Sequence, residues 1–78
     1  MREKRLRLIV TFRTTVAAMA MEAYCLEHGV PGRLIPVPRE ISAGCGMAWS
    51  APPEAEAVME EALSGAGISA ENFHRIVI

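Results

Sequence analysis

The stretch "LRLIVTF", residues 6–12, decides the fold, because its apolar residues recur at every second position. One side of an extended chain would carry Leu6, Leu8, Val10 and Phe12, and the other side would carry Arg5, Arg7, Ile9 and Thr11. A period of two is typical of a β-strand with one buried face. We therefore expect a strand here, with its leucine-bearing side turned toward the core.

The next two segments predict a helix and an edge strand. "TTVAAMAMEAYCLEHG", residues 14–29, begins with Thr14 and Thr15, either of which can cap a helix, and it ends at Gly29. "GRLIPVP", residues 32–38, is extended, but its two prolines cannot donate to a sheet ladder. The prolines therefore place this strand at a sheet edge.

The remaining chain supplies a strand, a helix and a last strand. "GMAWSA" (46–51) is a short strand, and "PPEAEAVMEEALSGAG" (52–67) is a helix that starts near Pro53 and is ended by Gly65 and Gly67. "FHRIVI" (73–78) closes the chain as a strand. The order βαββαβ predicts an α+β, ferredoxin-like sandwich, in which a four-stranded antiparallel sheet carries both helices on one face. At 78 residues the chain forms one domain, residues 1–78.

Charge and composition exclude several classes of function. A net charge of −1 provides no field that would attract nucleic acid, and the open face of the first strand offers arginines rather than aromatic side chains for stacking bases. Arg7 and Arg13 interrupt the apolar stretch near the start, so we expect neither a signal peptide nor a membrane span. Two cysteines are too few for a disulfide framework, so we expect free thiols in the cytoplasm.

The stretch "PREISAGCGMAWSAP", residues 38–52, places Cys45 between Gly44 and Gly46. The topology brings this connection to the end of the molecule where the first helix begins, close to Arg13 and Thr14. A helix N-terminus and the arginines Arg13 and Arg39 would stabilise a thiolate there and lower the pKa of Cys45. A tight turn around a semi-buried cysteine would give the same pattern, so the residues alone leave both interpretations open.

The same region resembles a known family. "LIPVPREISAGCGMA" (34–48) is similar to the signature of short bacterial proteins described as selenium/sulfur carrier-like, which reads Pro-x-Pro-Arg-x-Ile-Ser, a short gap and Cys-Gly. The likeness extends to "TFRTTVAAMAMEA" (11–23) and nearly the whole chain. The resemblance implies that Cys45 is the carrier position and that its motif companions are Pro38, Arg39, Ser42 and Gly46. The Cys-Pro-x-Pro motif of better-known sulfur-relay proteins is absent, so their mechanism does not transfer.

These observations favour a cytoplasmic protein that holds sulfur or selenium on Cys45 as a persulfide-type adduct. A donor protein would supply the atom and an acceptor protein would take it, without a cofactor, so we expect a carrier rather than a turnover enzyme. The supporting residues would be Arg39, Ser42, Gly44, Gly46, Arg13 and Thr14. The alternative is a non-catalytic dimeric interaction domain or a small-ligand-sensing domain. We expect a homodimer through the sheet face away from the helices, while the choice between sulfur and selenium stays open.

The other cysteine and the histidines have simpler interpretations. Cys25 shares a helix stripe with Ala18 and Met21, which predicts a core residue about 15 Å from the helix start. Because a disulfide needs Cα atoms within about 7 Å, we expect no bond between Cys25 and Cys45. His74 begins the last strand near the Cys45 end, and a part for it in the chemistry stays open. The spacing of cysteines and histidines matches no metal-binding pattern, so we expect no metal.

Overall fold

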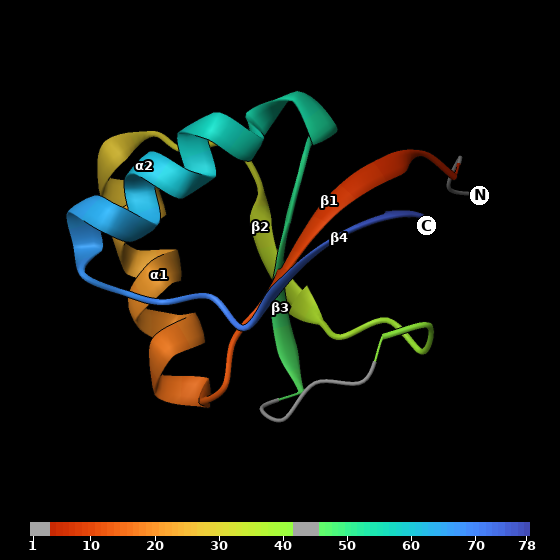
Figure 1. Cartoon of the computed structure of the whole chain (residues 1–78), viewed down its shortest axis with the longest axis horizontal. Helices are drawn as coiled ribbons and strands as arrows, with labels where there is room; N and C mark the ends of the chain where they lie inside the picture. Colours follow the sequence, from red (N-terminus) through yellow and green to blue (C-terminus); the bar gives the residue numbers. More distant parts are fainter. Residues whose placement is uncertain (1–3, 42–45) are drawn as a thin grey trace.

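The computed structural model describes residues 4–41 and 46–78. Within these residues it contains one four-stranded sheet and two α-helices in the order βαββαβ. The elements are β1 (Leu6–Thr11), α1 (Thr15–His28), β2 (Arg33–Pro36), β3 (Met47–Ala51), the 3₁₀ turn η1 (Pro53–Ala55), α2 (Glu56–Ala66) and β4 (Asn72–Val77). The sheet order is β2-β3-β1-β4 with antiparallel neighbours, and both helices cover one face (Figure 1). The predicted ferredoxin-like arrangement is confirmed.

Strand β1 has the predicted side toward the helices. Val10 lies opposite Trp49 of β3 and Phe73 of β4, and directly opposite residues share a sheet face. The side chains of Leu8, Val10 and Phe12 are completely buried. Leu6 lies opposite Val77 at the far end of the strand, where both side chains are about half exposed, so the prediction of burial is wrong for Leu6.

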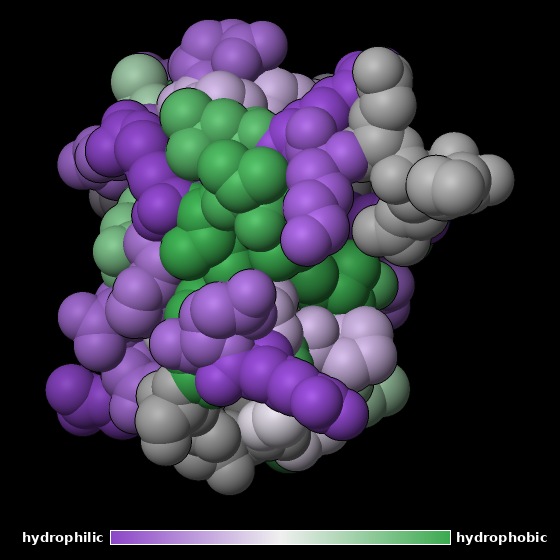
Figure 2. All heavy atoms as spheres, turned by 90° about the vertical axis from the view of Figure 1, so that its right-hand side faces the viewer, coloured by the Kyte–Doolittle hydropathy of each residue, from purple (hydrophilic) through white to green (hydrophobic). Residues whose placement is uncertain are grey.

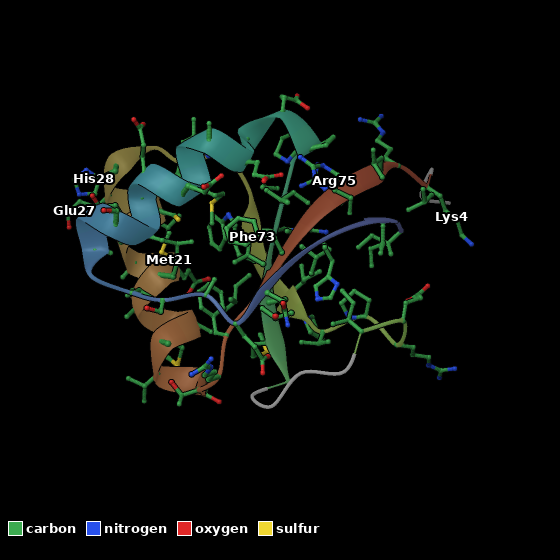
Figure 3. The ribbon with its side chains drawn as sticks, in the orientation of Figure 1. Lys4, Met21, Glu27, His28, Phe73 and Arg75 are labelled. Carbon is green, nitrogen blue, oxygen red and sulfur yellow. The ribbon has the colours of Figure 1, made fainter. Side chains whose placement is uncertain are left out.

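The main core fills the space between the sheet and the two helices. Met21 and Cys25 of α1, Met59 of α2 and Trp49 of β3 are all buried there. In Figure 3 the side chains of Met21 and Phe73 point into this layer from opposite sides. The prediction that Cys25 is a core residue is therefore confirmed.

The helix ends explain where the chain turns. Thr14, with an extended backbone (φ −134°), caps α1, because its Oγ1 accepts a hydrogen bond from the Ala17 N–H at 3.1 Å. Helix α2 ends at Gly67, whose φ of 69° is left-handed. Gly65 was expected at this end but lies inside α2. A Cβ at Gly65 would collide with the hydroxyl of Tyr24, so this glycine serves the close approach of the two helices.

The sheet face away from the helices corrects the sequence interpretation, which left Ile9 and Thr11 on an open surface. Both side chains are buried, at 0% and 1% exposure. Ile41, from the connection between β2 and β3, packs on Ile9 and Ala48, and this second apolar cluster is completed by Ile35, Val37, Ile76 and Ile78. Figure 1 shows residues 37–41 on the side of the sheet opposite to the helices. A loop therefore covers part of the face that periodicity alone left exposed.

Candidate functional site

The site region lies where three strands meet at one end of the sheet. Thr11 at the end of β1 pairs with Ala48 near the start of β3 and with Asn72 at the start of β4. The Thr11 hydroxyl also donates to the Asn72 carbonyl at 3.3 Å. Gly46 directly precedes β3, so the end of the connection from β2 reaches this point. Helix α1 begins a few residues after Thr11, at the same end of the sheet.

Gly46 closes the connection between β2 and β3. Its carbonyl accepts a hydrogen bond from the Val37 N–H at 3.0 Å, and its φ of 77° is in the left-handed region that favours glycine. The predicted site residues Ser42, Gly44 and Cys45 lie outside the described residues.

Arg39 belongs to a turn on the face away from the helices. The Ile41 N–H donates to the Pro38 carbonyl at 3.0 Å, which closes the turn, and Arg39 is exposed on it. The turn is held against the sheet because Ile41 is buried on Ile9. Arg39 is therefore placed beside the apolar cluster of this face.

Arg13 and Thr14 lie at the start of α1, on the helix-covered side of the sheet. Both side chains are exposed, and the first turn of α1 contains no acidic residue. Aligned backbone dipoles give a helix N-terminus a partial positive charge, and Arg13 adds a full charge beside it. The structure thus places Arg13 on the helix-covered side of the sheet and Arg39 on the turn over the opposite face.

Cys25 has the environment of an unreactive thiol. Its side chain is completely buried and forms no disulfide. Burial disfavours the charged form and raises the pKa of Cys25 to about 11. At neutral pH this thiol is protonated, and thiols react as thiolates. Cys25 is therefore excluded as the reactive cysteine.

The histidines lie apart from one another. His74 lies opposite Ile9 on the face away from the helices and is half-buried. His28 is exposed at the end of α1, where its ring stacks on Tyr24 with centroids 4.0 Å apart. Its Nε2 is 3.8 Å from a carboxylate oxygen of Glu27.

Sequence reasoning missed Glu71, which directly precedes β4. Its backbone N–H donates to the Thr11 carbonyl at 2.7 Å, so it lies at the site end of the sheet. Its carboxylate oxygen Oε1 is buried and has no hydrogen-bond partner among residues 4–41 and 46–78. The topology alone could have indicated the place of Glu71, because the link from α2 to β4 must reach the end of the sheet where β4 begins.

An apolar groove lies beside the connection from β2. It has a volume of about 440 Å³ and is lined by Arg33, Leu34, Ile35, Pro36, Pro38 and Ile78. Figure 2, which views the molecule from the side away from the helices, shows a hydrophobic surface bordered by hydrophilic residues. The sequence pattern did not predict this groove, because its walls come from β2, the following turn and the end of the chain.

Two further findings concern metal and membrane. Within residues 4–41 and 46–78, no three residues of the types His, Cys, Asp and Glu come close enough together to hold a metal ion. Neither helix in this part of the chain has the length and apolar character needed to cross a membrane.

The fold and the loop together define a small ferredoxin-like domain with a Cys-Gly pair between β2 and β3. The family described as "Putative Se/S carrier protein-like" matches residues 7–75, and the chain belongs to this family. The matched range includes Cys45 and the other predicted site residues. No curated protein and no solved structure shows a significant match to the chain.

Proposed function

We propose that the protein carries a sulfur or selenium atom on Cys45 and transfers it between partner proteins. One observation carries this assignment within the family. The chain has two cysteines, and Cys25 is buried in the core with a pKa of about 11. Cys45 is the thiol that remains for the chemistry that the family description names.

The transfer step is an exchange between sulfur atoms. The Cys45 thiolate attacks the terminal sulfur of a persulfide on the donor. A bond forms between Cys45 Sγ and the transferred sulfur, while the bond to the donor's own sulfur breaks and the donor leaves as a thiolate. The exchange needs no external oxidant or reductant and no cofactor. Selenium follows the same course when it takes the terminal position.

The surrounding groups support a thiolate at this position. Arg13 and the N-terminus of α1 approach the site end from the helix side, and Arg39 lies on the turn that leads into the loop. Positive charge favours the thiolate over the thiol. Ser42 and Gly44 complete the motif in the sequence.

Intact-protein mass spectrometry tests the assignment. Wild-type, Cys25→Ala and Cys45→Ser proteins would be incubated with a small-molecule persulfide and measured without reductant. We expect the mass of one added sulfur atom on the wild type and on Cys25→Ala, and none on Cys45→Ser. Retention of the added sulfur by Cys45→Ser would show that the proposal is wrong.

Alkylation rates test the contribution of Arg39. In the Cys25→Ala background, Arg39→Ala should slow reaction of Cys45 with iodoacetamide at pH 7 by about two- to fivefold, as expected for the loss of one nearby exposed charge. Arg33→Ala removes another exposed arginine, from β2, and serves as the control. Equal alkylation rates in the two variants would show that Arg39 does not contribute to the reactivity of Cys45.

The groove supports the alternative function, a dimeric interaction domain or a small-ligand domain. It is apolar and open at the surface, as is common for both kinds of site. Light scattering at high micromolar concentration tests the dimer. A monomer at that concentration would exclude self-association as the protein's main role.

A further inference from the structure

The helices and the connecting segments of the molecule differ in their charged residues. Every charged residue on the helices and the 3₁₀ turn is a glutamate: Glu22, Glu27, Glu54, Glu56, Glu60 and Glu61. The described lysine and arginines all lie on strands and connections. In Figure 3, Lys4 and Glu27 lie at opposite ends of the view, whereas Arg75 lies close to α2. The face away from the helices is therefore richer in arginine than in glutamate, although Glu40 lies in the turn after β2, and Arg75 of β4 pairs with Glu56 on the helix side.

Arginines of this face border the groove. Arg33 lines the groove and lies opposite Ser50, so its side chain shares the face away from the helices. Arg7 is on the same face, and its Nε donates to the Ser50 hydroxyl at 3.1 Å. Among the described strand residues, no acidic side chain lies on this face, and the turn that covers it contains Glu40 beside Arg39. The groove therefore combines an apolar floor with a basic border.

The groove also runs up to the loop that carries Cys45. Pro38 lines it, and the neighbouring Val37 donates its N–H to the carbonyl of Gly46. Gly46 is the residue that follows Cys45 in the chain. A segment bound in the groove would therefore reach one end of the connection that contains the cysteine.

We propose that this groove docks an apolar segment bearing carboxylates, from the protein that exchanges sulfur or selenium with Cys45. The identity of that partner rests on the proposed carrier function. The segment's apolar side chains would cover Ile35 and Ile78, and its carboxylates would meet Arg33. Pro36 and Pro38 have no N–H to offer, so docking uses side chains more than addition of a strand to β2.

Other occupants fit the face less well. A second copy docked through the same face would bring the arginines of both chains together, and like charges across an interface are unfavourable. Single-stranded RNA would need aromatic side chains for stacking. The aromatic residues of the sheet, Trp49 and Phe73, belong to the core on the helix side.

The test uses two synthetic peptides, one of alternating leucine and glutamate and one of alternating leucine and lysine, titrated into the ¹⁵N-labelled protein. We expect the glutamate peptide to shift the amide signals of Arg33, Ile35 and Ile78, with weaker binding as salt is added. The lysine peptide should bind at least fivefold more weakly. Equal binding of both peptides, or shifts confined to the helices, would overturn the proposal.

Matched variants test the charge of the groove. Arg33→Gln and Ala57→Glu each lower the net charge by one, but Ala57 is exposed on α2. Arg33→Gln should weaken binding of the glutamate peptide about two- to fivefold, and Ala57→Glu should leave it unchanged. An equal loss of peptide affinity in both variants would show that only the net charge of the protein matters, which would contradict docking at the groove.

Three further measurements separate the possible occupants and the two proposals. Shifts at the same amides on raising the protein concentration alone would assign the groove to a second copy. Shifts with an RNA oligonucleotide but not with the glutamate peptide would assign it to nucleic acid, and either result overturns the docking proposal. Cys45→Ser should still bind the peptide. Sulfur loading of the wild type without peptide binding would reject the docking site and leave the carrier function intact. Peptide binding without sulfur loading would reject the carrier function and leave the docking site intact.

Discussion

The sheet face covered by the helices buries Phe12, Trp49 and Met59 almost completely, whereas on the opposite face Ile9 is buried in a smaller cluster with Ile41 of the connection from β2 to β3. The helix side is covered by α1 and α2, whose backbone groups are hydrogen-bonded within each helix. The other side depends on a connection that is held by the Ile41 contact and by the hydrogen bond between Val37 and Gly46. Segments with few buried apolar contacts open most easily. We therefore expect global stability to depend mainly on the helix-covered face, and local opening to begin on the other.

The largest effect should come from the helix side. Phe12→Ala removes a completely buried ring and should lower the free energy of unfolding by about 3–5 kcal/mol, measured by urea denaturation followed by circular dichroism. Leu6→Ala, on the same side of β1 but 46% exposed, is the control and should cost about 1 kcal/mol or less. Equal losses would mean that burial does not distinguish the two ends of the strand.

Alkaline pH should weaken the helix side through Cys25. The pKa of this thiol is raised from 9.0 to about 11 in the folded protein. Between these values the unfolded chain loses the proton while the folded chain keeps it, so stability falls as pH rises, by up to about 1.4 kcal/mol per pH unit. Below pH 9 the Cys25 thiol is protonated in both the folded and the unfolded chain, so this loss of stability does not occur.

Urea denaturation of the wild type and Cys25→Ala at several alkaline pH values measures this effect. The steeper decline of the wild type between pH 9 and 11 should be absent in Cys25→Ala. Parallel curves would show that other groups cause the decline.

On the opposite face, Ile41→Ala should lower the free energy of unfolding by about 2 kcal/mol. This is the low end of the range for a buried isoleucine, because Ile41 lies on a loop that can readjust. Hydrogen exchange would locate the effect. The Val37 and Ile41 amides should lose protection, while those of Leu8 and Val10 should change only with global stability. A uniform loss across both faces would contradict a locally anchored loop.

The smallest effect tests the start of α1. Thr14→Ala removes the cap on the Ala17 N–H and should cost about 1 kcal/mol in thermal or urea unfolding. Thr15→Ala changes the first helical residue and should have little effect. A larger loss of stability for Thr15→Ala than for Thr14→Ala would show that Thr15, not Thr14, caps the helix.

Much of the fold was predictable because its signals are local. The alternation of Leu8, Val10 and Phe12 predicted the buried side of β1, and the prolines predicted an edge position for β2. The burial of Ile9 was not predictable, because it depends on Ile41, a residue far along the chain. Gly65 was misread as a helix end because its close neighbour, Tyr24, belongs to the other helix.

The candidate site was predictable only in part. Topology indicated that the loop before β3 and the start of α1 share one end of the sheet, as Gly46, Thr11 and Arg13 now show. It did not indicate that Arg39 lies on the face away from α1, because that depends on how the turn folds over Ile9. The groove depends on the same turn.

The hydrogen bond from the Trp49 indole N–H to the Pro31 carbonyl, at 3.1 Å, places the chain's single tryptophan at 1% exposure in the strand that follows Cys45. All indole fluorescence of the protein therefore comes from one buried ring in one environment. Emission should be blue-shifted in the folded state and should shift to the red on unfolding, so the protein contains an unlabelled optical reporter in β3. Fluorescence can then follow folding of this strand while mass spectrometry follows the cysteine.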